Sequence, residues 1–291
     1  MDFHTLDAEL RRLGTSIDSL SIIGAALRLR IDGTATHPEV ETRLRSALDV
    51  ILPSSLNDLD QREIAIALEL VALHFKQAAE LFENPHRSPA WVVQDPMMLQ
   101  AQGQGSRQNI RNILAMAEKR PALAATLAGR FLDVGTGVAA MALEAAETCP
   151  ALHVVGLDIL PAALTLARAN VAASPHAARI EIREQNVTVL AEANSYTLIW
   201  LPLPFLALPI AHAAMDRLVP ALSPNGYLVA GFYPLPPNRV QAEIAALRMV
   251  RSGGHVWDGA ALAQELHDRG LLDVEICPHG RVAHVIGRKP G

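Results

Sequence analysis

The sequence is poor in cysteine, and we expect from its first residues that it carries no secretion leader. Cys149 and Cys277 lie far apart and form neither a metal-ligand spacing nor a disulfide framework. The first residues contain an early acid, Asp2, and no apolar run, which argues against a signal peptide. We therefore expect a protein of the reducing cytoplasm, without a metal ion.

The sequence also lacks a membrane-spanning run and an excess of positive charge. Its most apolar stretch, residues 198–211, is shorter than the roughly 20 residues that a spanning helix needs, and it contains three prolines. We expect this stretch to be a buried strand that runs into a loop. The formal net charge is −5, whereas nucleic-acid binding usually needs a basic face. The sequence thus predicts neither a membrane nor a nucleic-acid partner.

The first hundred residues show no strand pattern. Apolar residues recur at helical spacing over residues 6–29, 40–51 and 64–82. We expect residues 1–94 to form an all-helical cap and residues 95–291 to form the larger domain on which it rests.

From residue 95 onward, short apolar runs alternate with helical patterns, which is typical of βαβ units and a parallel sheet. Helices are predicted over residues 95–119, 139–148 and 161–172. Strands are predicted over residues 130–134, 152–157, 180–182, 196–201, 227–232, 271–277 and 282–287. Only residues 278–281 separate the last two strands, which is too short for a parallel crossover, so these two should pair antiparallel.

One glycine-rich turn lies where a ligand site is expected, between a predicted strand and a predicted helix. Gly135-Thr136-Gly137 follows a predicted strand and precedes a predicted helix, and Asp158 ends the next strand. Glycines let the backbone approach a ligand closely, and a helix N-terminus offers free N–H groups. An acid at the end of the second strand typically accepts hydrogen bonds from ribose hydroxyls. The spacing predicts a ligand that contains adenosine.

The residue before the turn narrows the choice of ligand. Asp133 would repel a pyrophosphate, whereas it suits the ammonium group of a methionine moiety. Ala140 stands where a dinucleotide fingerprint often has glycine, although alanine is tolerated there. The sequence favours S-adenosylmethionine over a dinucleotide.

These motifs resemble those of class I S-adenosylmethionine-dependent methyltransferases. Residues 131–137, Phe-Leu-Asp-Val-Gly-Thr-Gly, look like the first motif of that family, and residues 154–158 resemble the second. Residues 222–228 resemble the turn before the fifth strand, and residues 271–289 the terminal hairpin. The resemblance implies an α/β fold, with a Rossmann-like, seven-stranded, mostly parallel sheet and an antiparallel C-terminal hairpin.

The cofactor-binding residues are assigned from the resemblance and from their positions in the sequence. Asn186 stands where the family often has an acid that binds adenine. Gln102 and Ser106 follow the junction between cap and core and are candidates for the methionine end. The predicted cofactor-binding residues are Gln102, Asp133, Gly135, Thr136, Gly137, Asp158, Ile159, Asn186, Val187 and Leu201.

Aromatic side chains near the ends of the fourth and fifth strands are the predicted catalytic residues. Trp200, Phe205 and Tyr233 would place ring faces next to a sulfonium cation, with core packing as the alternative. Amino-methylating members of the family often carry Asn-Pro-Pro-aromatic here, but residues 202–205 read Pro-Leu-Pro-Phe. His212 and His255 are candidates for a catalytic acid or base, and the alternative is that each is an ordinary surface or core histidine.

We expect a methyltransferase of specialised metabolism that acts on a small molecule, and a homodimer is compatible with the sequence. The first alternative is a lyase or cyclase that consumes S-adenosylmethionine, releases methylthioadenosine and forms a product such as azetidine-2-carboxylate. The second is a protein that binds the ligand without reaction. Detection of S-adenosylhomocysteine, methylthioadenosine or neither product would separate the three.

Overall fold

The computed structural model describes residues 1–91, 95–280 and 282–291. The chain divides into two compact units, Met1–Arg87 and Ser88–Gly291, each of which is described by itself. The expected boundary after Gln94 falls among residues 92–94, which lie outside the described residues. Arg281, in the expected connection over residues 278–281, lies outside them as well. Within these limits, no helix is both long and apolar enough to cross a bilayer.

The first unit is helical, as predicted. Its helices are α1 (Phe3–Asp32), α2 (Pro38–Ile51), the 3-10 turn η1 (Leu56–Asp58) and α3 (Gln61–Glu83). Local sequence sets the ends of these helices. Gly33 terminates α1 with a φ of 61°, a conformation that glycine adopts at little cost. Asp60 and Glu63 form a capping box at the start of α3.

α1 and α3 pack closely against each other. A Cβ on Gly24 of α1 would lie 2.9 Å from Cγ1 of Val71 in α3, so the absent side chain permits the close approach. Leu27 and Ile64 are buried in the same unit. These few side chains form its small apolar core.

The second unit is built on one seven-stranded sheet with the order β3-β2-β1-β4-β5-β7-β6. β1 to β5 run parallel, whereas β7 is antiparallel to both β5 and β6, which confirms the predicted fold class and hairpin. The strands are β1 (Arg130–Val134), β2 (His153–Asp158), β3 (Ile180–Glu184), β4 (Tyr196–Pro202), β5 (Leu222–Phe232), β6 (Leu272–His279) and β7 (Val282–Arg288).

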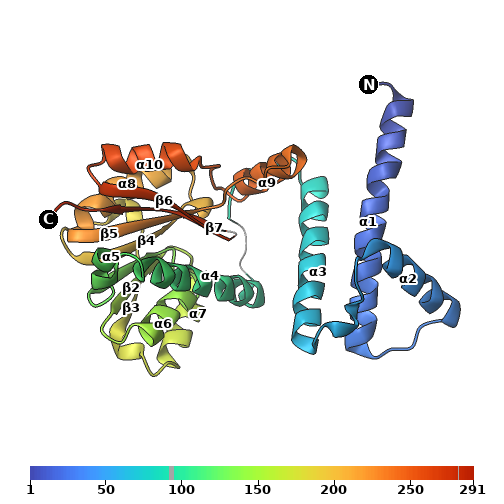
Figure 1. Cartoon of the computed structure of the whole chain (residues 1–291), viewed down its shortest axis with the longest axis horizontal. Coiled ribbons are helices and arrows are strands. Elements are labelled where there is room, and N and C mark those ends of the chain that lie inside the picture. Colours follow the sequence, from blue (N-terminus) through green and yellow to red (C-terminus); the bar gives the residue numbers. More distant parts are fainter. Residues whose placement is uncertain (92–94, 281) are drawn as a thin grey trace. The chain divides into compact units, whose positions relative to one another are not determined.

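Helices cover both faces of this sheet (Figure 1). The helices of this unit are α4 (Pro96–Ala117), α5 (Pro121–Thr126), α6 (Ala140–Thr148), α7 (Pro161–Ala172), α8 (Leu208–Ala221), α9 (Arg239–Arg251) and α10 (Gly259–Asp268), and all of them except α9 contribute to the two cores on the sheet. Side chains alternate between the faces, as in any strand. Leu132 of β1 packs toward α8 and α10, while Phe131 packs toward α4 to α7. Asp133 therefore points to the α4 side, among apolar groups.

Two differences from the sequence prediction concern the starts of α8 and β5. Residues 208–211, expected in a loop, begin α8, because Pro209 lies in the first turn, where a missing N–H costs nothing. β5 begins at Leu222, five residues before its predicted start, and Leu222 pairs with Tyr196 across a register shift.

Candidate functional site

The turn between β1 and α6 has the backbone that its glycines predict. Gly135 and Gly137 have φ angles of 65° and 58°. The N–H of Thr136 donates to the carbonyl of Leu157 at 2.9 Å, which ties the turn to β2. The N–H of Gly137 donates to Oδ2 of Asp158 at 2.8 Å. The acid at the end of β2 and the glycine turn therefore meet directly, as their spacing predicts.

The carboxylate of Asp158 is held in one orientation. Its Oδ1 accepts from the N–H groups of Ile159 at 2.7 Å and Leu160 at 2.9 Å. Two carboxylate oxygens offer about four acceptor positions. Since the backbone uses three, an acceptor position remains for a ligand hydroxyl at the carboxyl end of β2.

Asp133 is a buried acid at the end of β1. Only 1% of its surface is exposed, and its Oδ2 accepts from the hydroxyl of Thr136 at 2.7 Å. Burial raises the pKa of Asp133 to about 7; the bond from Thr136 opposes this rise, and the nearby charge of Asp158 adds to it. A cation next to this carboxyl would stabilise its ionised form.

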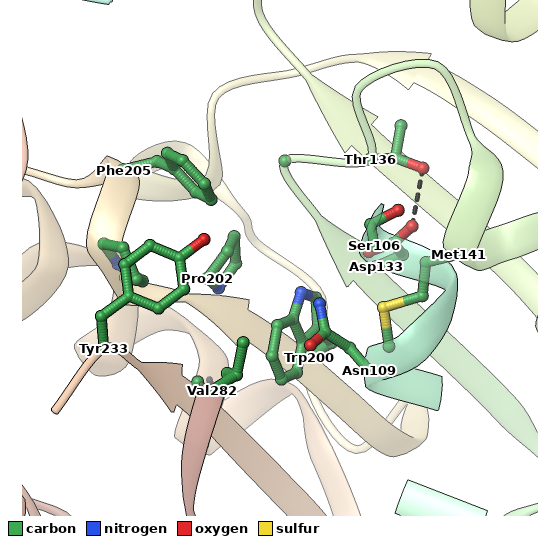
Figure 2. A pocket seen from close by; sticks show the side chains of 13 residues that line it. Ser106, Asn109, Asp133, Thr136, Met141, Trp200, Pro202, Phe205, Tyr233 and Val282 are labelled. Atoms are coloured by element: carbon green, nitrogen blue, oxygen red, sulfur yellow. Dashed lines mark hydrogen bonds between the residues drawn. The ribbon is translucent and has the colours of Figure 1, made fainter. Parts of the chain in front are cut away.

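A cavity of about 70 Å³ opens beside these groups. Figure 2 shows Asp133 and Thr136 on one side of it and Phe205 and Tyr233 on the other. The residues that line it are Ser106, Asn109, Asp133, Gly135, Thr136, Met141, Trp200, Pro202, Pro204, Phe205, Gly231, Tyr233 and Val282. The cavity thus joins the glycine turn to the ends of β4 and β5, where open α/β sheets bind ligands.

Aromatic rings form the wall away from the glycine turn. The ring centroids of Phe205 and Tyr233 lie 6.3 Å apart in an edge-to-face arrangement. Trp91 packs edge-to-face on Phe205 at 5.3 Å. Phe205 is 45% exposed, so it is a side chain of the cavity rim and not of the core. The three aromatic residues predicted as catalytic, with Trp200 the third, do line one cavity.

Several predicted site residues lie outside the cavity lining. Gln102 is exposed on α4, while Ser106 of the same helix lines the cavity. Leu201 is fully buried in the core on the other face of the sheet. Asn186 accepts hydrogen bonds from Thr188 at the start of the turn η3 (Val187–Val189), where its side chain is a local cap.

The two histidines considered as acid or base are also elsewhere. Nε2 of His212 lies 3.1 Å from a carboxylate oxygen of Glu265. His255 packs edge-to-face on Trp257 at 5.2 Å. Neither lines the cavity: His212 lies on α8, and His255 lies in the segment between α9 and α10.

Sequence reasoning missed some cavity residues that had a local signal. Asn109 follows Ser106 by one helical turn, so the same face of α4 presents both. Gly231 lies inside β5, and a glycine within a strand often marks a close approach. Met141 and Val282 come from α6 and β7, and only the folded sheet brings them together.

The groups at the glycine turn fit S-adenosylmethionine. A Cβ on Gly135 would lie 3.3 Å from Pro202, which leaves little room for a side chain in the cradle. The two acids, Asp133 and Asp158, complement a ligand with cationic groups and ribose hydroxyls. A phosphate group would instead face the buried Asp133 carboxyl. Among the described residues, no three histidine, cysteine, aspartate or glutamate side chains gather to hold a metal ion.

Known proteins share this fold and its central sequence. A family model described as a methyltransferase domain matches residues 131–226. A release factor glutamine methyltransferase of Xylella fastidiosa is 32% identical over 171 residues, which are 56% of this chain and 60% of that protein. The chain therefore matches about 60% of that curated relative's length.

Solved structures extend the likeness to nearly the whole chain. An O-methyltransferase family protein from Burkholderia thailandensis superposes with a TM-score of 0.73 at 17% identity, over 98% of both chains. Human N-acetylserotonin methyltransferase, solved with S-adenosylmethionine, gives a TM-score of 0.61 at 15% identity, over 100% of this chain and 99% of that one. At these identities the likeness is one of fold. Residues 131–226 thus match a methyltransferase domain, and the second unit has the fold of the class I S-adenosylmethionine-dependent methyltransferases.

Proposed function

We propose that this protein transfers the methyl group of S-adenosylmethionine to a small, largely apolar molecule. The observation that carries the proposal is one cavity that joins Asp133 and Gly135 at the β1 turn to the rings of Phe205 and Tyr233. A pocket with an apolar wall and a few polar groups is typical of small-molecule sites.

The chain's part in this reaction is to bind and align. S-adenosylmethionine, when bound, supplies a methyl group already activated by the sulfonium. Asp158 would hold the ribose hydroxyls, and Asp133 would face the methionine end, beside Ser106 and Asn109 of α4. Holding donor and acceptor in one geometry accounts for much of the rate enhancement in such transfers. The rings of Phe205 and Tyr233 would fix the acceptor and exclude water.

The partial relative points to another acceptor, a protein glutamine, but the end of β4 does not favour it. Residues 202–205 read Pro-Leu-Pro-Phe and provide no side-chain amide or carboxylate to hold the amide of a glutamine. The site's polar groups lie at the cofactor side of the cavity instead. A small acceptor that packs against rings is therefore the better match.

Binding and product formation test the proposal. S-adenosylhomocysteine should bind to the wild-type protein in calorimetry, and Asp158→Asn should weaken binding about tenfold, because a charge-assisted hydrogen bond is lost. Asp216→Asn on α8 is the matched control, since that exposed acid pairs with Arg269. Unchanged affinity of Asp158→Asn would refute the assignment of the ribose site.

The reaction products decide between the function classes. Incubation with S-adenosylmethionine and a panel of small aromatic and amine acceptors should release S-adenosylhomocysteine in an acceptor-dependent way. Methylthioadenosine formed without any acceptor would instead identify the cyclase or lyase reaction. Binding with neither nucleoside product across the panel would favour a protein that binds the ligand without reaction.

A further inference from the structure

The glycine loop, residues 135–139, holds a strained backbone. Gly135, Gly137 and Ala139 all have positive φ angles, of 65°, 58° and 64°. Glycine adopts this conformation freely, but Ala139 carries a Cβ that disfavours it. Such a residue persists only where the surrounding structure enforces its conformation. Groups outside the loop should therefore hold it.

One of these groups is the side-chain amide of Asn170. Its Nδ2 donates to the carbonyl oxygen of Val138 at 2.9 Å. Asn170 belongs to α7, which follows the Asp158 end of β2, whereas Val138 lies between Gly137 and Ala139. The bond therefore fixes the peptide group that precedes the strained alanine.

Gln100 of α4 sets the orientation of that amide. Its Nε2 donates to Oδ1 of Asn170 at 3.1 Å, and Nδ2 of Asn170 donates back to Oε1 of Gln100 at 3.3 Å. With Oδ1 engaged by Gln100, Nδ2 is the atom that faces Val138. A reversed amide would place two oxygens against each other. The pair of amides thus specifies a donor at the loop.

Gly103, one turn further along α4, confines the side chain of Val138. A Cβ on Gly103 would lie 2.2 Å from Cγ2 of Val138, so only glycine fits at this position. Val138 is 2% exposed and packs with Leu99 and Ala163. Val138 therefore fixes the loop through two contacts: its carbonyl group accepts the hydrogen bond from Asn170, and its side chain packs against Gly103.

We propose that Asn170, oriented by Gln100, and Gly103 are positioning residues that hold the glycine loop in its cofactor-binding conformation. None of the three lines the cavity, so they act through Val138. The inference rests on the proposed function, because it takes the loop to be the S-adenosylmethionine site. It adds a second layer of residues, from α4 and α7, on which the cofactor affinity depends.

Removal of the amide tests the first contact. Asn170→Ala should raise the Kd for S-adenosylhomocysteine and the KM for S-adenosylmethionine about fivefold, as expected for one lost hydrogen bond. The kcat at saturating cofactor should stay near that of the wild type. Asn112→Ala is the control. Asn112 accepts a hydrogen bond from the side-chain amide of Gln108 at 2.9 Å; both residues lie on α4, away from the loop.

Substitutions that add volume at residue 103 and remove it at residue 138 test the packing contact between Gly103 and Val138. Gly103→Ala should weaken cofactor binding, because its methyl group displaces Val138. Val138→Ala in the same chain should restore binding, since the new Cβ would then lie 3.6 Å from the Cβ of residue 138, an ordinary contact. Rescue by a second substitution distinguishes positioning from a general loss of folded protein. A double variant that binds as weakly as Gly103→Ala would count against the packing half of the proposal.

Hydrogen exchange supplies a readout that needs no ligand. Amides of residues 135–139 should exchange faster in Asn170→Ala than in the wild type, while those of β4 and β5 stay unchanged. If exchange and Kd both match the wild type, the positioning role is overturned. If the wild type binds no S-adenosylmethionine, the proposed function fails, and the exchange rates alone decide whether these residues hold the loop.

Discussion

Gly231 leaves the space that the indole of Trp200 fills. A Cβ built on Gly231 of β5 would lie 2.2 Å from Cη2 of Trp200 on the neighbouring β4. The six-membered ring of the indole therefore lies directly beside the backbone of Gly231, and both residues line the cavity. A glycine in a strand interior, which usually weakens a sheet, here admits a large ring.

Gly231→Ala should therefore force the indole out of place. We expect a loss of about 1–3 kcal/mol in the free energy of unfolding, typical of overpacking, together with altered tryptophan fluorescence. Trp200→Phe in the Gly231→Ala chain should recover most of this loss, because the shorter ring does not reach residue 231. Additive effects of the two substitutions in urea unfolding would contradict a direct clash.

The strands were predictable where apolar runs end in turn residues. β1 has the predicted bounds, since its run stops at the glycine turn. The start of β5 was not predictable, because Pro224 and Asn225 have the composition of a turn. In the folded sheet Asn225 takes a φ of 62°, and the strand continues past it. Pairing with β4 overrides local preference there.

The site residues that stand next to a strand end or a turn were predictable, whereas contacts between residues far apart in the sequence were not. Asp133 and Asp158 follow from position, because each ends a strand beside a turn. The contacts of Asn170 with Val138 and Gln100 join residues 32 and 70 positions apart, so no local pattern signals them. The helices α9 and α10 were not predicted either, because no motif falls within their residues. Contacts between distant segments appear only once the sheet order is known.

The buried carboxyl of Asp133 should make stability depend on pH. Its pKa is about 7 in the folded protein against an ordinary value of 3.8, so the folded state binds this proton more tightly than the unfolded state. Its contribution to the free energy of unfolding is complete below about pH 4 and is lost as the pH rises to about 7. Because Asp133→Asn has no proton to lose, it should lack this decline.

Urea unfolding of the wild type and of Asp133→Asn at pH 5 and pH 8 measures the effect. Relative to the wild type, the variant should gain about 3 kcal/mol of stability between the two pH values. The difference between the two proteins removes the contributions of all other acids. A difference that is the same at both pH values would show that Asp133 titrates normally.

An exposed apolar stripe along the N-terminal half of α1 predicts that the protein self-associates. Apolar residues at alternating three- and four-residue spacing are the seam of a coiled coil. Phe3, Leu6, Leu10, Leu13 and Ile17 have this spacing and are 42–75% exposed. The unit Met1–Arg87 buries few apolar side chains of its own, so a second copy is the partner that would complete it. We propose a homodimer that pairs α1 with α1.

Sedimentation velocity at micromolar concentrations tests the dimer. Leu10→Glu with Leu13→Glu should yield a monomer, because two charges would be buried in the seam. Ala8→Glu with Thr15→Glu adds the same charge to other exposed positions of α1 and should leave the dimer intact. A monomeric wild type, or equal behaviour of the two double variants, would refute an interface on this stripe.

The rings of Phe205 and Tyr233 should control use of the acceptor and not of the cofactor. The two rings pack edge-to-face with centroids 6.3 Å apart, on the wall of the cavity away from Asp133. Phe205→Leu and Tyr233→Leu keep apolar bulk but remove the flat faces that hold an acceptor in line with the methyl group. We expect each variant to lose about tenfold in kcat/KM for the acceptor, which corresponds to about 1.4 kcal/mol. The Kd for S-adenosylhomocysteine should change less than twofold, and Phe82→Leu, at a ring that is 87% exposed on α3, should leave both quantities as in the wild type. Equal losses in acceptor and cofactor binding would mean that the rings support the whole site, whereas no loss in either would make them ordinary packing residues.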